Sequence, residues 1–256
     1  MNYLAVAHTD IGLVKDKNQD SYCLMSAQTD IGEVLLAVIC DGLGGLTKGE
    51  LASKTVVEAF VEWFEQRLPI IIQNEFSMLK VAQSWNTLIT KVNSDIFNYG
   101  VENNCRIGTT VVATLFSNGQ VLISNVGDSR CYSIRNSIRQ LTKDHTYIDR
   151  EIREGRMTKE AAAKDVNKNM LLQCVGATNS VKPDFFELDT EGDRVFLLCS
   201  DGFRHLLKEE EMLGILKPVL LNDETSMKVN LIDLTDLNKQ RGEKDNITTI
   251  LIKTIG

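Results

Sequence analysis

The chain has 256 residues, 43% of them hydrophobic, and a formal net charge of −7. This composition can supply a sizeable core and argues against global disorder. The acidic balance, without a lysine or arginine run, argues against a nucleic-acid partner, and no apolar run approaches the ~18 residues that a membrane helix needs.

The first half of the chain predicts strands with two helices inserted between them. Asn118-Gly119 is a strong hairpin turn between two strands rich in β-branched residues. Pro69 and Asn74 are expected in the connection between the helices. Strands are predicted over 2–8, 21–25, 34–40, 108–116 and 121–126, and helices over 47–66 and 78–98.

The second half continues with short strands joined by tight turns, which indicates an antiparallel sheet and not a βαβ series. Residues 145–168 are charged and helix-prone, with few large apolar side chains, so a flap subdomain is expected over about 145–180. The absence of repeats and linkers favours a single domain over 1–256. Further strands are predicted over 131–134, 138–141, 181–188, 194–199 and 247–252, and helices over 208–216 and 224–238.

One buried strand, residues 35–40, runs directly into Asp41-Gly42-Leu43-Gly44-Gly45 and then into a helical pattern. A dinucleotide fingerprint that starts at Gly42 fails at Thr47, and a phosphate loop that starts at Gly44 fails at Glu50. A carboxylate at the head of this loop indicates a metal site, because an acid at the end of a buried strand needs a cation to offset its desolvation.

Other acids occupy similar positions. Asp201 ends an apolar strand before a glycine, Asp245 precedes a β-branched run, and Asp20 and Asp128 lie where turns meet strands. Each acid alone can be an ordinary turn residue. Carboxylates gathered at one edge of a sheet would repel one another, and a hard divalent cation such as Mg²⁺ or Mn²⁺ would remove that repulsion.

Several motifs follow one another in a fixed order, and together they resemble the type 2C metal-dependent Ser/Thr protein phosphatases in their bacterial form. The resemblance covers nearly the whole chain. It implies an α+β fold, a four-layer sandwich of two packed antiparallel β-sheets flanked by α-helices, with a flap subdomain. The motifs are Thr9-Asp10-x-Gly12 with Asn18-Gln19-Asp20, Asp41-Gly42-x-Gly44-Gly45, Gly108-Thr109-Thr110, Gly127-Asp128-Ser129-Arg130, Leu141-Thr142-x-Asp144-His145, Ser200-Asp201-Gly202 and Asp245-Asn246-Ile247-Thr248.

The resemblance also implies a role for each acid. Asp41 would bridge two metal ions, Mn²⁺ or Mg²⁺, with the Gly42 carbonyl on one of them. Asp201 and Asp245 would bind the other ion. Asp128, with help from Asp201, would hold a weaker third metal, and Asp20 would orient the attacking water or bind a metal directly. Water would attack phosphorus, so that no cysteine or serine nucleophile is required.

The sequence departs from the family at two places. The phosphate-binding arginine of relatives falls at Lys15, which offers a point charge and no bidentate fork, so weaker binding of the substrate phosphate is predicted. A solvated loop lysine is the alternative. Leu43 replaces a proposed leaving-group acid, so the proton donor stays unassigned. His145 and His205 are more simply structural, and no nucleophile-elbow pattern surrounds Ser200.

The flap can control substrate access or be a plain surface insertion. Its arginines Arg150, Arg153 and Arg156 can contact a phosphoprotein, but a solvated helix face is the simpler interpretation. Six scattered cysteines without a C-x-x-C pair are expected to be free thiols in a reducing cytoplasm. They lie at 23, 40, 105, 131, 174 and 199.

The predicted function is hydrolysis of phosphoserine and phosphothreonine in protein substrates. By family analogy alone, a Ser/Thr kinase and its targets are the expected partners, and the enzyme is expected to be a cytoplasmic monomer without nucleic-acid or membrane partners. Two alternatives stay open from the sequence: a dedicated regulatory phosphatase of one phosphoprotein, and a catalytically inactive binding module of the same fold. No attached sensor domain and the intact acids 41, 201 and 245 argue against them.

Overall fold

The computed structural model describes residues 2–43, 48–190 and 192–255, and its strands form two antiparallel sheets. The first sheet has the order β1-β10-β9-β6-β7 and the second the order β2-β3-β4-β5-β8. The strands are β1 (Asn2–Asp10), β2 (Ser21–Thr29), β3 (Gly32–Cys40), β4 (Val111–Ser117), β5 (Gln120–Val126), β6 (Arg130–Ile134), β7 (Ile138–Gln140), β8 (Asp184–Asp189), β9 (Arg194–Cys199) and β10 (Ile247–Ile255).

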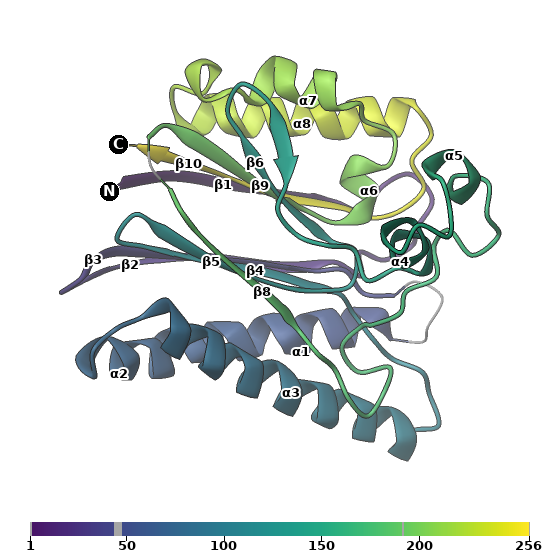
Figure 1. Ribbon diagram of the computed structural model, residues 1–256, viewed down its shortest axis with the longest axis horizontal. Coiled ribbons are helices and arrows are strands. Elements are labelled where there is room, and N and C mark those ends of the chain that lie inside the picture. Colours follow the sequence, from purple (N-terminus) through teal and green to yellow (C-terminus); the bar gives the residue numbers. More distant parts are fainter. Residues whose placement is uncertain (1, 44–47, 191, 256) are drawn as a thin grey trace.

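Helices cover the outer face of each sheet (Figure 1). Helices α1, α2 and α3 lie against the second sheet, and α7 and α8 lie against the first, which confirms the predicted four-layer α+β sandwich. The helices are α1 (Gly49–Glu62), the π-helical turn η1 (Trp63–Arg67), α2 (Leu68–Gln73), α3 (Met78–Glu102), α4 (Tyr147–Arg153), α5 (Lys159–Ala162), α6 (Asp201–Arg204), α7 (Glu209–Leu216), the 3₁₀ turn η2 (Pro218–Leu220) and α8 (Glu224–Gln240).

Strand β3 shows why the layers form. Successive side chains of a strand point to opposite faces, so a strand with both faces covered must be apolar throughout. Val34, Leu36 and Val38 pack into the core beneath α1 and α3. Leu35 and Ile39 pack into the core between the two sheets. A third core, beneath α7 and α8, completes the stack.

The structure corrects one local prediction and gives the bounds of the others. Pro69 lies inside α2 and not in a connection, because the π-helical turn η1 directly before it already departs from the regular α-helical hydrogen-bond pattern. The first predicted helix begins at Gly49, and its predicted start at residue 47 lies outside the described residues. The charged stretch over residues 145–168 forms two short helices, α4 and α5. The four-residue helix α6 was not predicted, because it is too short to show a periodic pattern in the sequence.

The strand ends place several distant segments together. Asp10 at the end of β1 pairs with Ile247 at the start of β10, and Ser21 at the start of β2 pairs with Cys40 at the end of β3. All of these ends lie at one end of the sandwich, where α4, α5 and α6 also lie (Figure 1). The loops that carry the predicted acids therefore leave the sheets at the same edge.

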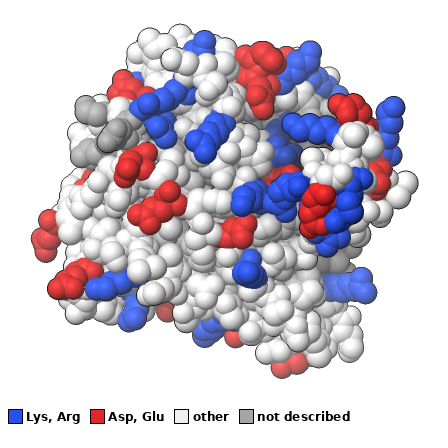
Figure 2. All heavy atoms as spheres, in the orientation of Figure 1, with Lys and Arg blue, Asp and Glu red and all other residues white. Residues whose placement is uncertain are grey.

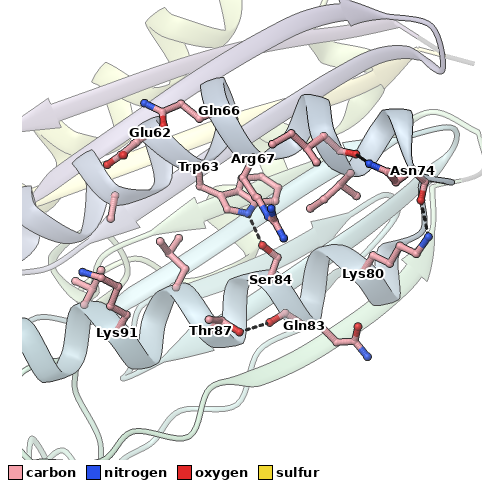
Figure 3. A pocket seen from close by; sticks show the side chains of 15 residues that line it. Glu62, Trp63, Gln66, Arg67, Asn74, Lys80, Gln83, Ser84, Thr87 and Lys91 are labelled. Carbon is pink, nitrogen blue, oxygen red and sulfur yellow. Dashed lines mark hydrogen bonds between the residues drawn. The ribbon is translucent and has the colours of Figure 1, made fainter.

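A hollow of about 980 Å³ lies on the outer face of the molecule, between η1 and α2 on one side and α3 on the other (Figure 3). The indole Nε1 of Trp63 donates a hydrogen bond of 2.8 Å to Ser84 Oγ across it. Its lining mixes Glu62 with Arg67 and Lys91, and so does not indicate one class of ligand. No helix among the described residues is both long enough and apolar enough to span a bilayer.

We predict that Phe116→Ala will strongly destabilise the sandwich, because this ring joins the two sheets. Phe116 on β4 is fully buried and its centroid lies 5.6 Å from Tyr3 on β1 and 4.9 Å from Phe196 on β9. Truncation of a buried Phe costs about 3–5 kcal/mol. Urea unfolding followed by circular dichroism measures this loss. Leu79→Ala, at a position 65% exposed, is the control and should change stability by less than about 0.5 kcal/mol.

Candidate metal centre

The five predicted acids gather at the edge of the sandwich where the strand ends meet. Burial raises the pKa of Asp41 well above its usual range, and the nearby carboxylates of Asp20, Asp201, Asp128 and Asp245 raise it further. These acids come from five separate segments of the chain, and each is close enough to disfavour ionisation of Asp41. The structure thus brings together every carboxylate that the sequence singled out.

Backbone contacts hold Asp41 at the end of β3. Its N–H donates to Thr110 Oγ1 at 3.0 Å, and its carbonyl accepts from Thr110 N at 2.9 Å and from Thr109 Oγ1 at 2.8 Å. The Thr110 hydroxyl also lies 2.7 Å from Ser129 Oγ. The motifs around 108–110 and 127–130 therefore position the loop that carries Asp41, a role that sequence reasoning did not assign to the two threonines.

Gly42 is required by packing. A Cβ at this position would lie 2.5 Å from the carbonyl oxygen of Gly49 and 2.6 Å from that of Gln19, and Gly42 N donates to the latter at 3.2 Å. The absence of a side chain at Gly42 thus lets the backbones of two other segments approach closely. The remaining glycines of this motif, 44 and 45, lie outside the described residues.

A second close approach joins Asp201 to Asp245. A Cβ at Gly202 would lie 2.2 Å from the carbonyl oxygen of Asn246, so only glycine lets α6 pack on the start of β10. A Cβ at Gly202 would also lie 3.4 Å from the Cβ of Asp245. Two acids that are 44 positions apart in the sequence are brought side by side in this way.

Asp20 provides buried oxygen atoms without partners. Neither carboxylate oxygen accepts a hydrogen bond of normal geometry. Burial raises the pKa of Asp20 to about 7, although the nearby hydroxyls of Thr248 and Ser200 act in the opposite direction. One oxygen of Asp201, Oδ1, is also buried without a partner. Buried polar groups are normally satisfied, so these oxygen atoms are suited to act as ligands of a cation.

Lys15 supplies one positive charge to the cluster. Its ammonium lies 2.9 Å from Asp245 Oδ1. Burial acts to lower the pKa of Lys15, but the hydrogen bond to Asp245 and the charges of Asp41 and Asp201 raise it. Within 2–43, 48–190 and 192–255, no three His, Cys, Asp or Glu side chains are already close enough together to hold a metal ion. The carboxylate set itself, with its unpartnered buried oxygens, fits a hard divalent cation.

Two arginines border the site on the side of Asp128. Arg204 Nη2 donates to the Asp128 backbone carbonyl at 3.1 Å and lies 3.4 Å from its Oδ2. Burial, and then Asp201, raise the pKa of Asp128 to about 6, while Arg204 lowers it. The Arg130 guanidinium binds the Asp144 carboxylate in a bidentate manner, with Nε donating to Oδ1 at 2.9 Å and Nη2 donating to Oδ2 at 2.6 Å. These pairs fix the turn around residues 127–130.

The two histidines have structural contacts. His145 is buried, accepts a hydrogen bond at Nδ1 from Gly127 N, and has Nε2 3.3 Å from Asp184 Oδ2. His205 lies between Asp201 and Glu243, at 3.5 and 3.6 Å. The interpretation of both as structural residues therefore agrees with their surroundings.

The arginines of the flap form ion pairs with acids of the flap itself. Arg150 and Arg156 contact Glu151 at 3.3 and 2.6 Å, and Arg153 contacts Asp149 at 3.2 Å. Figure 2 shows both signs of charge side by side where α4 and α5 lie. This arrangement favours the solvated helix face over a phosphoprotein contact for these side chains.

Asn246 is a further residue whose role the sequence did not reveal. Its buried side chain accepts from Gln19 N at 2.9 Å and donates to the carbonyls of Ile11 and Lys17 at 2.8 and 3.1 Å. It therefore fastens the loop that carries Lys15 and Asp20 to the start of β10. Its position directly after Asp245 was the only available signal.

The fold and the acidic edge define a metal-dependent hydrolase with its site at the end of a β-sandwich. The model of the protein phosphatase 2C family matches residues 14–234, so the chain belongs to that family. A serine/threonine phosphatase stp of Listeria monocytogenes is 32% identical over 96% of this chain and 93% of its own length. The structure of Stp1 from Staphylococcus aureus superimposes with a TM-score of 0.85, at 31% identity, over 98% of this chain and 95% of that one.

A further solved structure, the catalytic domain of the phosphatase PstP in complex with two manganese ions, matches with a TM-score of 0.78 at 25% identity, over 99% of both chains. Together these relatives identify the chain as a bacterial-type protein serine/threonine phosphatase that depends on divalent metal and acts on phosphoproteins. They do not favour an inactive binding module or a phosphatase dedicated to one phosphoprotein.

We predict that Asn246→Ala will release the loop over residues 11–19. Loss of three buried hydrogen bonds removes its attachment to β10, so trypsin should cut after Lys15 and Lys17 at least about tenfold faster, as expected for about 1–2 kcal/mol of lost stability. Mass spectrometry of timed digests measures this. Asn74→Ala, which removes one exposed hydrogen bond to Ile70, is the control. Equal cleavage rates in the two variants would contradict the assigned role.

Proposed function

We propose that two divalent cations, Mn²⁺ or Mg²⁺, bind between the carboxylates of Asp41, Asp201 and Asp245, with the Gly42 carbonyl as a further ligand. The observation that carries this proposal is the convergence of these acids around unpartnered buried oxygens of Asp20 and Asp201. The two manganese ions of the PstP structure support the number and the class of ion. Asp128, with Asp201, would hold a weaker third ion.

When bound, such cations supply Lewis acidity, which makes water a nucleophile at neutral pH and offsets charge on the phosphate oxygens. Asp20 orients the attacking water through its buried carboxylate. The free thiols play no part as nucleophiles, because five of the six cysteines are buried, and burial raises the pKa of Cys23 to about 12 and of Cys174 to about 11.

Lys15 has two roles in this proposal. Its ammonium neutralises Asp245 at 2.9 Å in the present structure, and it lies near Asp41 and Asp201. A divalent cation bound to these acids would displace it from Asp245, and the released ammonium would then bind the substrate phosphate. A single ammonium gives weaker and less directional phosphate binding than a guanidinium fork.

The wider cellular role is proposed by analogy. A Ser/Thr kinase and its protein targets would be the source of the phosphoserine and phosphothreonine that the enzyme hydrolyses. The six free cysteines support a cytoplasmic location. Residues 1–256 would act as one catalytic unit and as a monomer, since every proposed ligand comes from a single chain, with the flap at about 145–180 beside the site.

We predict that Asp245→Asn will remove most phosphatase activity, because one metal ion would be poorly held. Turnover of a phosphothreonine peptide with added Mn²⁺ should fall by about 100-fold or more in kcat/KM, equal to about 2.7 kcal/mol. Titration calorimetry should detect weaker Mn²⁺ binding. Asp95→Asn, an acid on α3 that also pairs with a lysine, is the matched control. Full activity in Asp245→Asn would refute the proposed metal centre.

Substitutions of Lys15 separate its two proposed roles. We expect Lys15→Ala to raise the KM for a phosphopeptide by about tenfold, as typical for the loss of one charged hydrogen bond, and to tighten Mn²⁺ binding by removing a competing cation. Lys15→Arg should lower the KM, because the guanidinium can bind phosphate through two parallel hydrogen bonds. Steady-state kinetics and calorimetry measure the two effects. An unchanged KM in Lys15→Ala would show that Lys15 does not bind the phosphate.

A further inference from the structure

A second hollow, of about 880 Å³, lies directly beside the loop that carries Asp41. Its lining comes from Leu43, from the end of α3 and the residues after it, and from residues 169–177 of the flap. The end of α3 lies at the same end of the molecule as the strand ends that carry the acids (Figure 1). Leu43, Phe97 and Val101 form one part of its lining, and Ile107, Leu171 and Ala177 form another. Hollows of this size accept side chains or small ligands.

The hollow is built on a short ladder that includes the residue after Asp41. Gly42 pairs with Thr109, and Thr109 pairs with Val175. The second pairing has hydrogen bonds of 3.0 Å from Thr109 N to Val175 O and 2.8 Å from Val175 N to Thr109 O. Leu43 N also donates to Gly108 O at 3.1 Å. Leu43, next to Gly42, and Cys174 and Gly176, on either side of Val175, line the hollow.

Apolar surface is left uncovered around this opening. Val101, in the last turn of α3, is 61% exposed, and Leu43 and Leu171 are half-buried. Gly176 packs closely against the side chain of Ile96, because a Cβ at this position would lie 2.2 Å from Ile96 Cγ2. Asn104, Arg106 and Asn169 also line the hollow. An apolar side chain that entered it would contact the apolar part of the lining, and burial of that contact would be favourable.

We propose that this hollow binds an apolar side chain of the phosphoprotein substrate, close in sequence to the phosphorylated residue. The inference rests on the proposed placement of the reacting phosphate beside Asp41. Leu43 is two residues from Asp41, and an extended chain advances about 3.3–3.6 Å per residue, so the occupant lies within about three residues of the phosphoserine or phosphothreonine. The site thus selects among phosphoproteins by the residue that flanks the phosphate.

The test compares phosphothreonine peptides with Leu, Gly, Asp or Lys at each flanking position, hydrolysed by the whole protein with Mn²⁺. At one position we expect Leu to lower KM by about tenfold relative to Gly or Asp, with little change in kcat, as expected for burial of a side chain of this size. Each kcat/KM is divided by that for p-nitrophenyl phosphate, which has no flanking residue. This ratio separates binding of the peptide from the chemical step.

Two sets of variants test whether the hollow causes the preference for Leu at this peptide position. Ala177→Phe should fill it and remove most of the preference for Leu, whereas Ala163→Phe, on an exposed flap position outside the hollow, should keep the preference. Val101→Lys should shift the preferred residue at the same peptide position toward Asp, and Val101→Asp should shift it toward Lys. A purely structural role of Val101 would not produce opposite shifts.

Failure of this inference differs from failure of the proposed function. Equal KM values for all peptides, or one preference shared by every variant, would overturn the binding of an apolar flanking residue while hydrolysis itself continues. If the wild-type protein with Mn²⁺ hydrolysed neither p-nitrophenyl phosphate nor any peptide, the proposed metal centre would be refuted and this inference would fall with it.

Discussion

Mutual repulsion among carboxylates is the constraint on which this structure depends. Two unit charges 4 Å apart repel by about 1 kcal/mol in water and by about four times as much near a protein surface. The fold resists this repulsion with backbone contacts, since Thr110 holds the Asp41 backbone and Gly202 lies against Asn246. Divalent cations would relieve the repulsion and would bind only the folded chain, so they should also stabilise the fold.

The counter-charges are distributed unevenly around these acids. Arg204 contacts Asp128 on one side, and Lys15 contacts Asp245 on the other, while Asp20 has no cation within contact among the described residues. A guanidinium already bound to Asp128 competes with an ion at that position, whereas the centre of the cluster offers unpartnered oxygens. This difference is the physical reason to propose that an ion at Asp128 would bind more weakly than ions held by Asp41.

The four-layer fold was predicted from the resemblance to the phosphatase family, and the burial pattern of the strands agrees with it. A strand such as β3, which is apolar and buried at every position from 34 to 40, must be covered on both faces, and the tight turns between strands require antiparallel pairing. The site acids were found through ordered motifs. The four-residue helix α6 and the hydrogen bonds of Asn246 were missed, because neither short helices nor contacts between distant segments leave a periodic pattern. The hollow beside Leu43 joins three separate segments, which no local pattern could reveal.

The ladder of Gly42, Thr109 and Val175 connects chemistry with specificity. Thr109 fixes the Asp41 carbonyl through its hydroxyl and fixes the end of the flap through its backbone. A change in flap sequence can therefore alter which peptides enter the hollow while the ladder keeps the acids in place. Binding of the flanking residue and positioning of the acids would thus depend on the same three backbone segments, so a changed flap would alter the substrate and keep the reaction.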